Sequence, residues 1–250
     1  MSLSFGEGCQ HMPDILIIGA SRGLGLALSI GLANEGDNLW LVSRTRPESM
    51  DRQDGIIRRW IQADLNTPQE AASAIVTALA GQAIDALIYN AGIWETGSFG
   101  GGYRFETISA QMNIDVITVN LTAAVVCIQA LLPNIRQAES AKIILIGSTS
   151  GLENTNCPEV AYTASKFGLR GVAHALRESL RGDGVAVTCI NPGTFSYIPF
   201  DDGPEAVIAA TGNAVIPVHD LIAVIRCVMS LSKAACIKEI DMPSFADLTA

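Results

Sequence analysis

A tyrosine and a lysine four positions apart, Tyr162 and Lys166, are the residues of this sequence best suited by type and spacing to transfer a proton. Residues four apart on a helix lie on the same side, so the two side chains would be neighbours. A nearby ammonium favours the ionised form of a phenol and should lower the pKa of Tyr162 from its usual value of about 10. We therefore interpret Tyr162 as a candidate general acid or base.

A serine and an asparagine elsewhere in the chain are candidates to complete this site. Ser148 stands fourteen residues before Tyr162 and follows an apolar run that is typical of a buried strand. Its neighbours Thr149 and Ser150 are alternative hydroxyl donors. Asn120 lies in an uncharged helical stretch, where an interior asparagine is unfavourable unless its side chain has a partner. The resemblance to a known family, described below, implies that Asn120, Ser148, Tyr162 and Lys166 together are the catalytic residues.

A glycine-rich turn indicates that a nucleotide is bound nearby. The segment Gly19-Ala20-Ser21-Arg22-Gly23-Leu24-Gly25 separates an apolar run from a segment with helical periodicity. Such a turn lets a dinucleotide approach the backbone closely and directs free N–H groups at its pyrophosphate. Two further turns, Asn90-Ala91-Gly92 and Asn191-Pro192-Gly193, also follow apolar runs. If those runs are parallel strands of one sheet, the three turns border one cleft.

In this order the motifs resemble those of the short-chain dehydrogenase/reductase family, from about Ile15 to Pro243. The glycine turn is similar to the family's Thr-Gly-x-x-x-Gly-x-Gly, residues 90–92 to Asn-Asn-Ala-Gly, and residues 147–152 to Ser-Ser-x-x-Gly-Leu. Three positions depart from the pattern. Ile18 and Tyr89 replace a Thr and an Asn, and Tyr197 stands where the family often has Thr.

The resemblance implies roles for individual residues. Tyr162 would exchange the proton, Ser148 would orient the substrate oxygen, Lys166 would hold the nicotinamide ribose, and Asn120 would anchor a proton-relay water. The nicotinamide carboxamide would meet the backbone of Phe195 and a hydroxyl of Tyr197, Thr194 or Ser196. The residues expected to bind the cofactor are Gly19, Ser21, Arg22, Gly23, Leu24, Gly25, Arg44, Asp64, Leu65, Asn90, Ala91, Gly92, Tyr162, Lys166, Pro192, Gly193 and Phe195.

The choice between NAD and NADP depends on charge at the end of the second apolar run. An acidic residue there would accept from the ribose 2′-OH of NAD, whereas an arginine would pair with the 2′-phosphate of NADP. The run ends in Val42-Ser43-Arg44 without a carboxylate, and Arg22 lies inside the glycine turn. We therefore expect NADP(H) to be preferred, with NAD(H) possible.

Alternating apolar runs and helical segments predict the elements that position these residues. The runs, at 15–18, 39–42, 59–61, 84–89, 142–146, 185–190 and 237–240, are typical of strands buried on both faces. Helical periodicity covers 23–35, 67–80, 107–135, 161–181 and 219–231. This alternation predicts an α/β fold: a Rossmann-type, doubly wound parallel sheet of about seven strands with helices on both faces. We expect residues 13–250 to form one dinucleotide-binding and catalytic domain after a loose leader, 1–12.

Composition excludes several other functions. Lys+Arg 16 against Asp+Glu 25 leaves a formal charge of −9, which argues against nucleic acid as a partner. The uncharged stretch 116–135 is long enough to span a membrane, but its polar residues favour a buried or interfacial soluble helix. The six cysteines form no Cys-x-x-Cys pair and the three histidines are far apart, so we expect a reduced, cytoplasmic protein without a metal.

The sequence therefore predicts an NADP(H)-dependent oxidoreductase that interconverts a carbonyl compound and an alcohol. One alternative is a nucleotide-binding sensor or scaffold with little turnover, which the departures at Ile18, Tyr89 and Tyr197 would suit. Another is a sugar-nucleotide epimerase or dehydratase, although only 84 residues follow Lys166 to build a substrate domain. The segment 194–217 is mildly apolar, and the resemblance implies that it closes over the substrate. We expect the loop 97–102 to be a mobile surface loop, and the alternative is that it lines the mouth of the site together with Trp94. Family members usually pair through the helices at 107–135 and after Tyr162, so a homodimer or homotetramer is expected.

Overall fold

The computed structural model describes residues 12–99, 101–153 and 156–246, and its centre is one parallel sheet of seven strands. The strand order is β3-β2-β1-β4-β5-β6-β7, so the direction of winding reverses between β1 and β4. The strands are β1 Asp14–Ile18, β2 Asn38–Ser43, β3 Ile57–Gln62, β4 Ala86–Tyr89, β5 Lys142–Ile146, β6 Ala186–Pro192 and β7 Glu239–Met242. The predicted doubly wound fold is confirmed, and the reversal places the expected ligand cleft at the carboxyl ends of β1 and β4.

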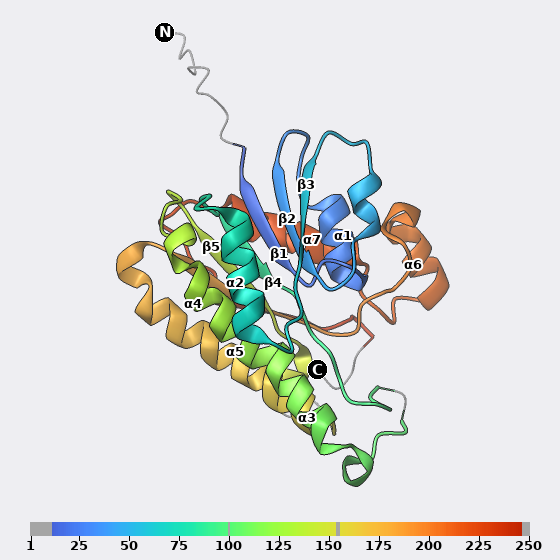
Figure 1. Ribbon diagram of the computed structural model, residues 1–250. Helices are drawn as coiled ribbons and strands as arrows, with labels where there is room; N and C mark the ends of the chain where they lie inside the picture. The colour runs from blue at the N-terminus through green and yellow to red at the C-terminus, as the bar shows by residue number, and fades with distance from the viewer. Residues whose placement is uncertain (1–11, 100, 154–155, 247–250) are drawn as a thin grey trace.

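Helices cover both faces of this sheet (Figure 1). On one face α2, α4 and α5 pack over side chains that include Leu16, Leu87 and Leu145. On the other, α1 and α7 pack over side chains that include Ile17, Ile88 and Ile144. The helices are α1 Gly23–Gly31, α2 Pro68–Leu79, α3 Ala110–Ile117, α4 Ala123–Ile135, α5 Val160–Ser179, α6 Gly203–Thr211 and α7 Val218–Ser230. Because both faces are covered, successive residues of the central strands are mostly apolar, which explains the continuous runs in the sequence.

The long helix predicted over 107–135 is divided into two by a wider turn. Ser109 caps α3, since its Oγ accepts from the backbone N–H of Met112 at 3.1 Å. A π-helical turn, Thr118–Thr122, then separates α3 from α4. By length and composition, Ala110–Ile135 would suffice to cross a membrane, and 44% of its most apolar window is buried within the protein. The predicted helix is therefore present over 110–135, and the departure from the prediction is the π turn at its centre, which contains Asn120.

Two other elements differ from the prediction. Strand β7 begins two residues later than the apolar run at 237–240, because its pairing with β6 starts at Cys189 and Glu239. As an edge strand, it alternates between exposed and half-buried residues and carries no continuous apolar run. Helix α6 lies inside the segment expected to close over the substrate and was not predicted. Its start and end are marked by Gly203-Pro204 and by Gly212, which has a positive φ of 58°.

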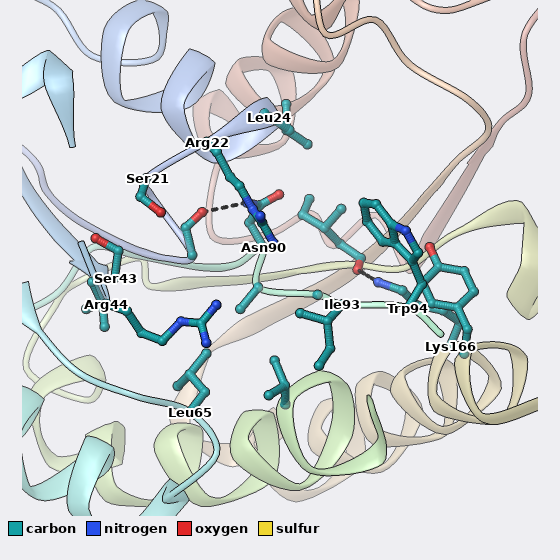
Figure 2. A pocket seen from close by; sticks show the side chains of 18 of the residues that line it. Ser21, Arg22, Leu24, Ser43, Arg44, Leu65, Asn90, Ile93, Trp94 and Lys166 are labelled. Atoms are coloured by element: carbon teal, nitrogen blue, oxygen red, sulfur yellow. Dashed lines mark hydrogen bonds between the residues drawn. The ribbon is translucent and has the colours of Figure 1, made fainter. Parts of the chain in front are cut away.

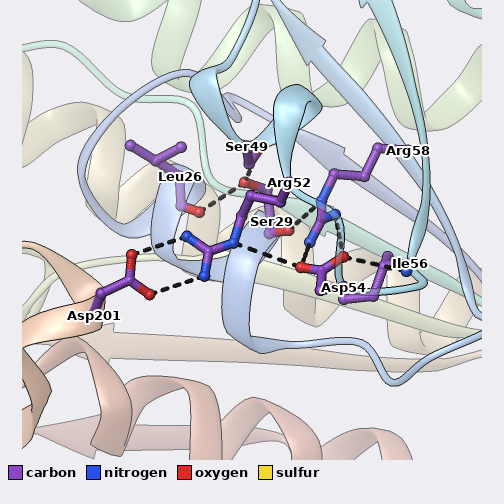
Figure 3. A network of polar contacts seen from close by, with 8 residues as sticks. All are labelled: Leu26, Ser29, Ser49, Arg52, Asp54, Ile56, Arg58 and Asp201. Atoms are coloured by element: carbon purple, nitrogen blue, oxygen red, sulfur yellow. Dashed lines mark hydrogen bonds and ion pairs between the residues drawn. The ribbon is translucent and has the colours of Figure 1, made fainter.

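An ion-pair network joins Asp201, which lies just before α6, to the loop between β2 and β3 (Figure 3). Arg52 forms two hydrogen bonds to Asp201, at 2.8 and 3.0 Å, and a longer contact with Asp54. The guanidinium of Arg58 also binds Asp54, and its hydrogen bonds lower the pKa of that carboxyl to about 2. The network joins the short turn before α6 to the loop that follows β2. The predicted leader, 1–12, lies outside the described residues except for Met12.

Candidate active site and cofactor pocket

The glycine turn after β1 packs directly against the turn after β4. Gly19 has a φ of +94°, and a Cβ at this position would lie 2.6 Å from the backbone of Ala91. A Cβ on Gly25 would lie 1.8 Å from the carbonyl oxygen of Gly19. The side-chain amide of Asn90 donates to that same carbonyl oxygen at 2.8 Å. Glycines are therefore required here to bring the two turns together at the reversal point of the sheet.

A cavity of about 380 Å³ lies at the carboxyl ends of the strands, beside these turns (Figure 2). Most residues predicted to bind the cofactor line it, namely Gly19, Ser21, Arg22, Gly23, Leu24, Arg44, Asp64, Leu65, Asn90, Ala91, Gly92, Tyr162, Lys166 and Phe195. Gly25, Pro192 and Gly193 do not line the cavity and instead shape the backbone behind it. The structure thus gathers residues from five strand ends around one space.

The predicted phosphate-binding arginines lie at one part of this cavity. Arg22 and Arg44 are both exposed and both line it. Figure 2 shows Arg44 extending across the cavity at the end opposite Lys166 and Trp94. Asp64, which follows β3, also lines this end and accepts from the backbone N–H of Asn66 at 3.0 Å. The arginines leave this part of the cavity attractive to an anionic group.

The tyrosine and lysine both lie on α5, at the other end of the cavity. The ammonium of Lys166 is 5.4 Å from the centre of the Tyr162 ring, so it faces the ring rather than the hydroxyl. It donates to the backbone carbonyl of Ile146, at the end of β5, at 3.0 Å. Ser148 follows β5, is nearly buried and accepts from the backbone N–H of Ser150 at 3.1 Å. The structure therefore brings the predicted tyrosine, lysine and serine together.

Burial is the main influence on the pKa values of Tyr162 and Lys166 in the structure. Burial raises the pKa of Tyr162 to about 12, although its hydrogen-bonding contact with Ser148 acts in the opposite direction. Burial also lowers the pKa of Lys166 to about 8. Without a bound nicotinamide, whose positive charge was expected to act together with Lys166, desolvation of the phenol is the largest contribution and the pKa of Tyr162 is raised. Tyr162 is consequently protonated at neutral pH.

Asn120 is held inside the π turn by bonds that use its whole side chain. Its Oδ1 accepts from the backbone N–H of Ile93 at 2.8 Å, and its Nδ2 donates to the carbonyl of Ile93 at 2.8 Å. The same Nδ2 donates to Ser165 at 3.0 Å. These contacts join the π turn, the loop after β4 and α5. The side-chain amide therefore fixes the backbone of the site, and π turns of this kind are frequent at functional sites.

Tyr89, one of the three departures from the family pattern, also stabilises this turn. It is fully buried at the end of β4, and its hydroxyl donates to the backbone carbonyl of Val119. Val119 lies in the π turn and lines the cavity. Burial raises the pKa of Tyr89 well above its usual value, so the hydroxyl remains a donor. The tyrosine thus forms a bond between β4 and the π turn.

Three hydroxyls were considered as partners of the nicotinamide carboxamide, and only two of them line the cavity. Thr194 and Tyr197 line the cavity, whereas Ser196 is buried and its Oγ accepts from the backbone N–H of Ile198 at 2.9 Å. Phe195 lines the cavity and is joined to Ile216 by a parallel bridge. Ser196 is therefore unavailable, and Thr194 and Tyr197 remain.

Glu95 was not predicted as a residue of the site, and Phe99 was considered only as part of the loop 97–102. Glu95 is fully buried, and its Oε1 accepts from the backbone N–H groups of Ala161 and Tyr162, at 2.8 and 3.2 Å. It therefore satisfies the amino end of α5, a position that favours negative charge. Phe99 lines the cavity beside Tyr162. Glu95 lies far from α5 in sequence, so no local spacing marks it as the cap.

Among the described residues, no cluster of three or more His, Cys, Asp or Glu is placed to hold a metal ion.

Comparisons with known proteins agree with this geometry. The family model for short chain dehydrogenases matches residues 14–199, so the chain belongs to the short-chain dehydrogenase/reductase family of oxidoreductases. An uncharacterised oxidoreductase of Myxococcus xanthus is 30% identical over 185 residues, which cover 71% of this chain and 70% of that protein.

Solved structures show the same fold. The 3-oxoacyl-[acyl-carrier protein] reductase of Brucella melitensis, in complex with NAD, superposes with a TM-score of 0.74 at 20% identity, over 94% of this chain and 96% of that one. The RhlG/NADP complex of Pseudomonas aeruginosa superposes with a TM-score of 0.73 at 24% identity, over 92% and 94%. At these identities the likeness shows the fold alone.

Replacing Tyr89 with Phe should destabilise the protein. The change leaves the buried carbonyl of Val119 without its donor, which costs about 1–3 kcal/mol. We expect urea unfolding to show this loss. Tyr103→Phe serves as a control, because Tyr103 bonds an exposed N–H of Val160 and its loss should have a much smaller effect. Equal stability of Tyr89→Phe and the native protein would show that the bond does not hold the π turn.

Proposed function

We propose that the protein is an NADP(H)-dependent reductase that converts a carbonyl compound to an alcohol, with Tyr162 as the general acid. The observation that supports this most directly is the placement of Tyr162 and Lys166 at one end of a cavity that Arg22 and Arg44 also line, with Arg44 at the opposite end and Ser148 in hydrogen-bonding contact with Tyr162. In this arrangement the arginines would bind the phosphate of a dinucleotide, and Tyr162 would donate a proton to a small substrate bound beside it in the same cavity.

The residues present fit such a cofactor. Gly19 and Gly23 line the cavity without side chains, so a pyrophosphate could approach the backbone of the turn closely. Arg22 and Arg44 would hold the 2′-phosphate of NADP, and no carboxylate ends β2 to repel it. Lys166 would hold the nicotinamide ribose, and Thr194 or Tyr197 would meet the carboxamide. When bound, the dinucleotide supplies the hydride.

The protein's own groups would manage the proton. As negative charge develops on the carbonyl oxygen, the hydroxyls of Ser148 and Tyr162 would donate to it, and Tyr162 would transfer its proton. With a pKa of about 12, the phenol of Tyr162 is protonated at neutral pH, which suits an acid better than a base. The ammonium of Lys166 would stabilise the phenolate that remains. These properties favour reduction over alcohol oxidation at neutral pH.

The sensor or scaffold alternative has less support. Two of the departures that suggested it are explained by the structure: Tyr89 forms a bond that stabilises the site, and Tyr197 still lines the cavity.

We also propose that the chain forms an oligomer by pairing through α3, α4 and α5. Large apolar side chains remain exposed on these helices, namely Ile114, Val125, Val160 and Phe167.

Replacing Tyr162 with Phe should remove carbonyl reduction without removing cofactor binding. General acid catalysis contributes about 10²–10⁴-fold, and we expect a loss in kcat of this size on a panel of ketones and aldehydes. The affinity for NADPH, followed by its fluorescence, should change by no more than about twofold, because the ring of Tyr162 is retained. Binding without turnover in the native protein, unaffected by Tyr162→Phe, would favour the sensor or scaffold.

Replacing Arg44 with Ala should weaken binding of NADPH much more than binding of NADH. Loss of a charge-assisted bond to the 2′-phosphate costs about 1.5–3 kcal/mol, roughly tenfold or more in Kd. Fluorescence titration with the two cofactors measures both values. Arg46→Ala is the matched control, because Arg46 is an exposed arginine that pairs with Asp51 and does not line the cavity. Equal losses for NADPH and NADH would show that the proposed cofactor preference is wrong.

A further inference from the structure

Aromatic side chains surround the reacting phenol. The ring of Phe99 lies 5.3 Å from that of Tyr162 at an interplanar angle of 83°, and the ring of Trp94 lies 6.5 Å from it at 88°. Trp94 and Phe99 also contact each other, with centroids 5.8 Å apart. All three rings line the cavity. We name Trp94 and Phe99 the aromatic wall.

The aromatic wall is held in place at some conformational cost. Phe99 has a φ of +59°, a region that bulky residues rarely adopt, and 58% of its surface is exposed. Its backbone N–H donates to the buried carboxylate of Glu159 at 2.9 Å, directly before α5. Strained backbone of this kind is found mainly where it serves a site. The bond positions an exposed apolar ring at the cavity.

Further contacts join the loop of the aromatic wall to the helix that carries Tyr162. Glu95, the residue after Trp94, accepts from the first N–H groups of α5. Tyr103, at the far end of the loop, accepts from the backbone N–H of Val160 at 3.0 Å. The wall and the phenol therefore form one unit, and a substrate whose oxygen reaches Tyr162 must pass beside Trp94 and Phe99.

The charges around the wall favour a neutral substrate. Of the charged residues that line the described cavity, Arg22, Arg44 and Asp64 lie toward the glycine turn or the ends of β2 and β3, and Lys166 is buried beneath the phenol. Behind the aromatic wall are the buried side chains of Glu95 and Glu159. Among the described residues, the only cation that lines this end is the buried ammonium of Lys166, which already donates to the carbonyl of Ile146. A carboxylate or phosphate on the substrate would therefore find no exposed cation beside the aromatic wall.

We infer that the substrate is a neutral carbonyl compound with a flat aromatic or conjugated ring beside the carbonyl group, which packs against Trp94 and Phe99 while Tyr162 meets its oxygen. This inference rests on the proposed reductase function. Aromatic pairs prefer offset or edge-to-face contacts, and their benefit exceeds that of apolar area alone. A saturated ring of similar size would fill the same space without that benefit.

The test compares acetophenone with cyclohexyl methyl ketone, two ketones of equal carbon number. The quantity measured is the ratio of kcat/KM for the aromatic ketone to kcat/KM for the saturated one, with NADPH. In Trp94→Leu and Phe99→Leu we expect this ratio to fall on the order of tenfold, because the apolar volume is largely kept and the aromatic contact is lost. Phe105→Leu is the control, since Phe105 is an exposed aromatic outside the cavity, and its ratio should be unchanged.

A binding measurement separates this inference from the proposed function. Saturation-transfer NMR on the NADP⁺-saturated protein reports contact with either ketone without turnover, and we expect a stronger signal for acetophenone that weakens in both leucine variants. Preferential binding of acetophenone that weakens in both leucine variants, together with no turnover of any ketone or aldehyde in the panel, would overturn the reductase function and support the aromatic wall. Turnover with ratios unchanged in both leucine variants, or equal binding of the two ketones, would overturn the inference alone.

Discussion

Burial of the Lys166 ammonium is the constraint on which the rest of the site depends. A charged amine inside a protein is costly unless polar groups replace its water. Here the carbonyl of Ile146 and the ring of Tyr162 take that place. The carbonyl is available because β5 ends at Ile146, and the ring is available because Tyr162 lies one helical turn before Lys166 on α5. The end of a strand and the start of a helix must therefore keep their relative positions.

Several contacts that look unrelated serve this requirement. Glu95 satisfies the first N–H groups of α5, and Asn120 joins the π turn to both Ile93 and Ser165 of α5. Tyr89 binds the π turn from β4. Each contact joins α5 or the π turn to the end of β4, beside the glycine turn. The position of the proton donor relative to the nucleotide cleft is thus fixed by polar bonds from three directions.

The sequence was informative where the signal was local. The glycine turn, the Tyr162 and Lys166 spacing and the apolar runs each depend on a few neighbouring residues, and they predicted the seven-stranded sheet and the cavity. The bonds of Tyr89 and Glu95 were not predicted, because their partners are distant in sequence. The π turn was missed because it keeps the apolar pattern of a helix. The raised pKa of Tyr162 without a bound nicotinamide was not predicted, because desolvation depends on the whole fold.

The most direct test of the account is the ionisation of Tyr162 itself, followed by ultraviolet absorbance of tyrosinate. Subtracting the titration of Tyr162→Phe from that of the native protein isolates one of four tyrosines. The account predicts that Tyr162 stays protonated to at least pH 10 without cofactor, since its pKa is about 12, and that saturating NADP⁺ moves its ionisation to lower pH. Ionisation near neutral pH without cofactor, or no shift with NADP⁺, would contradict the proposed control of the proton donor.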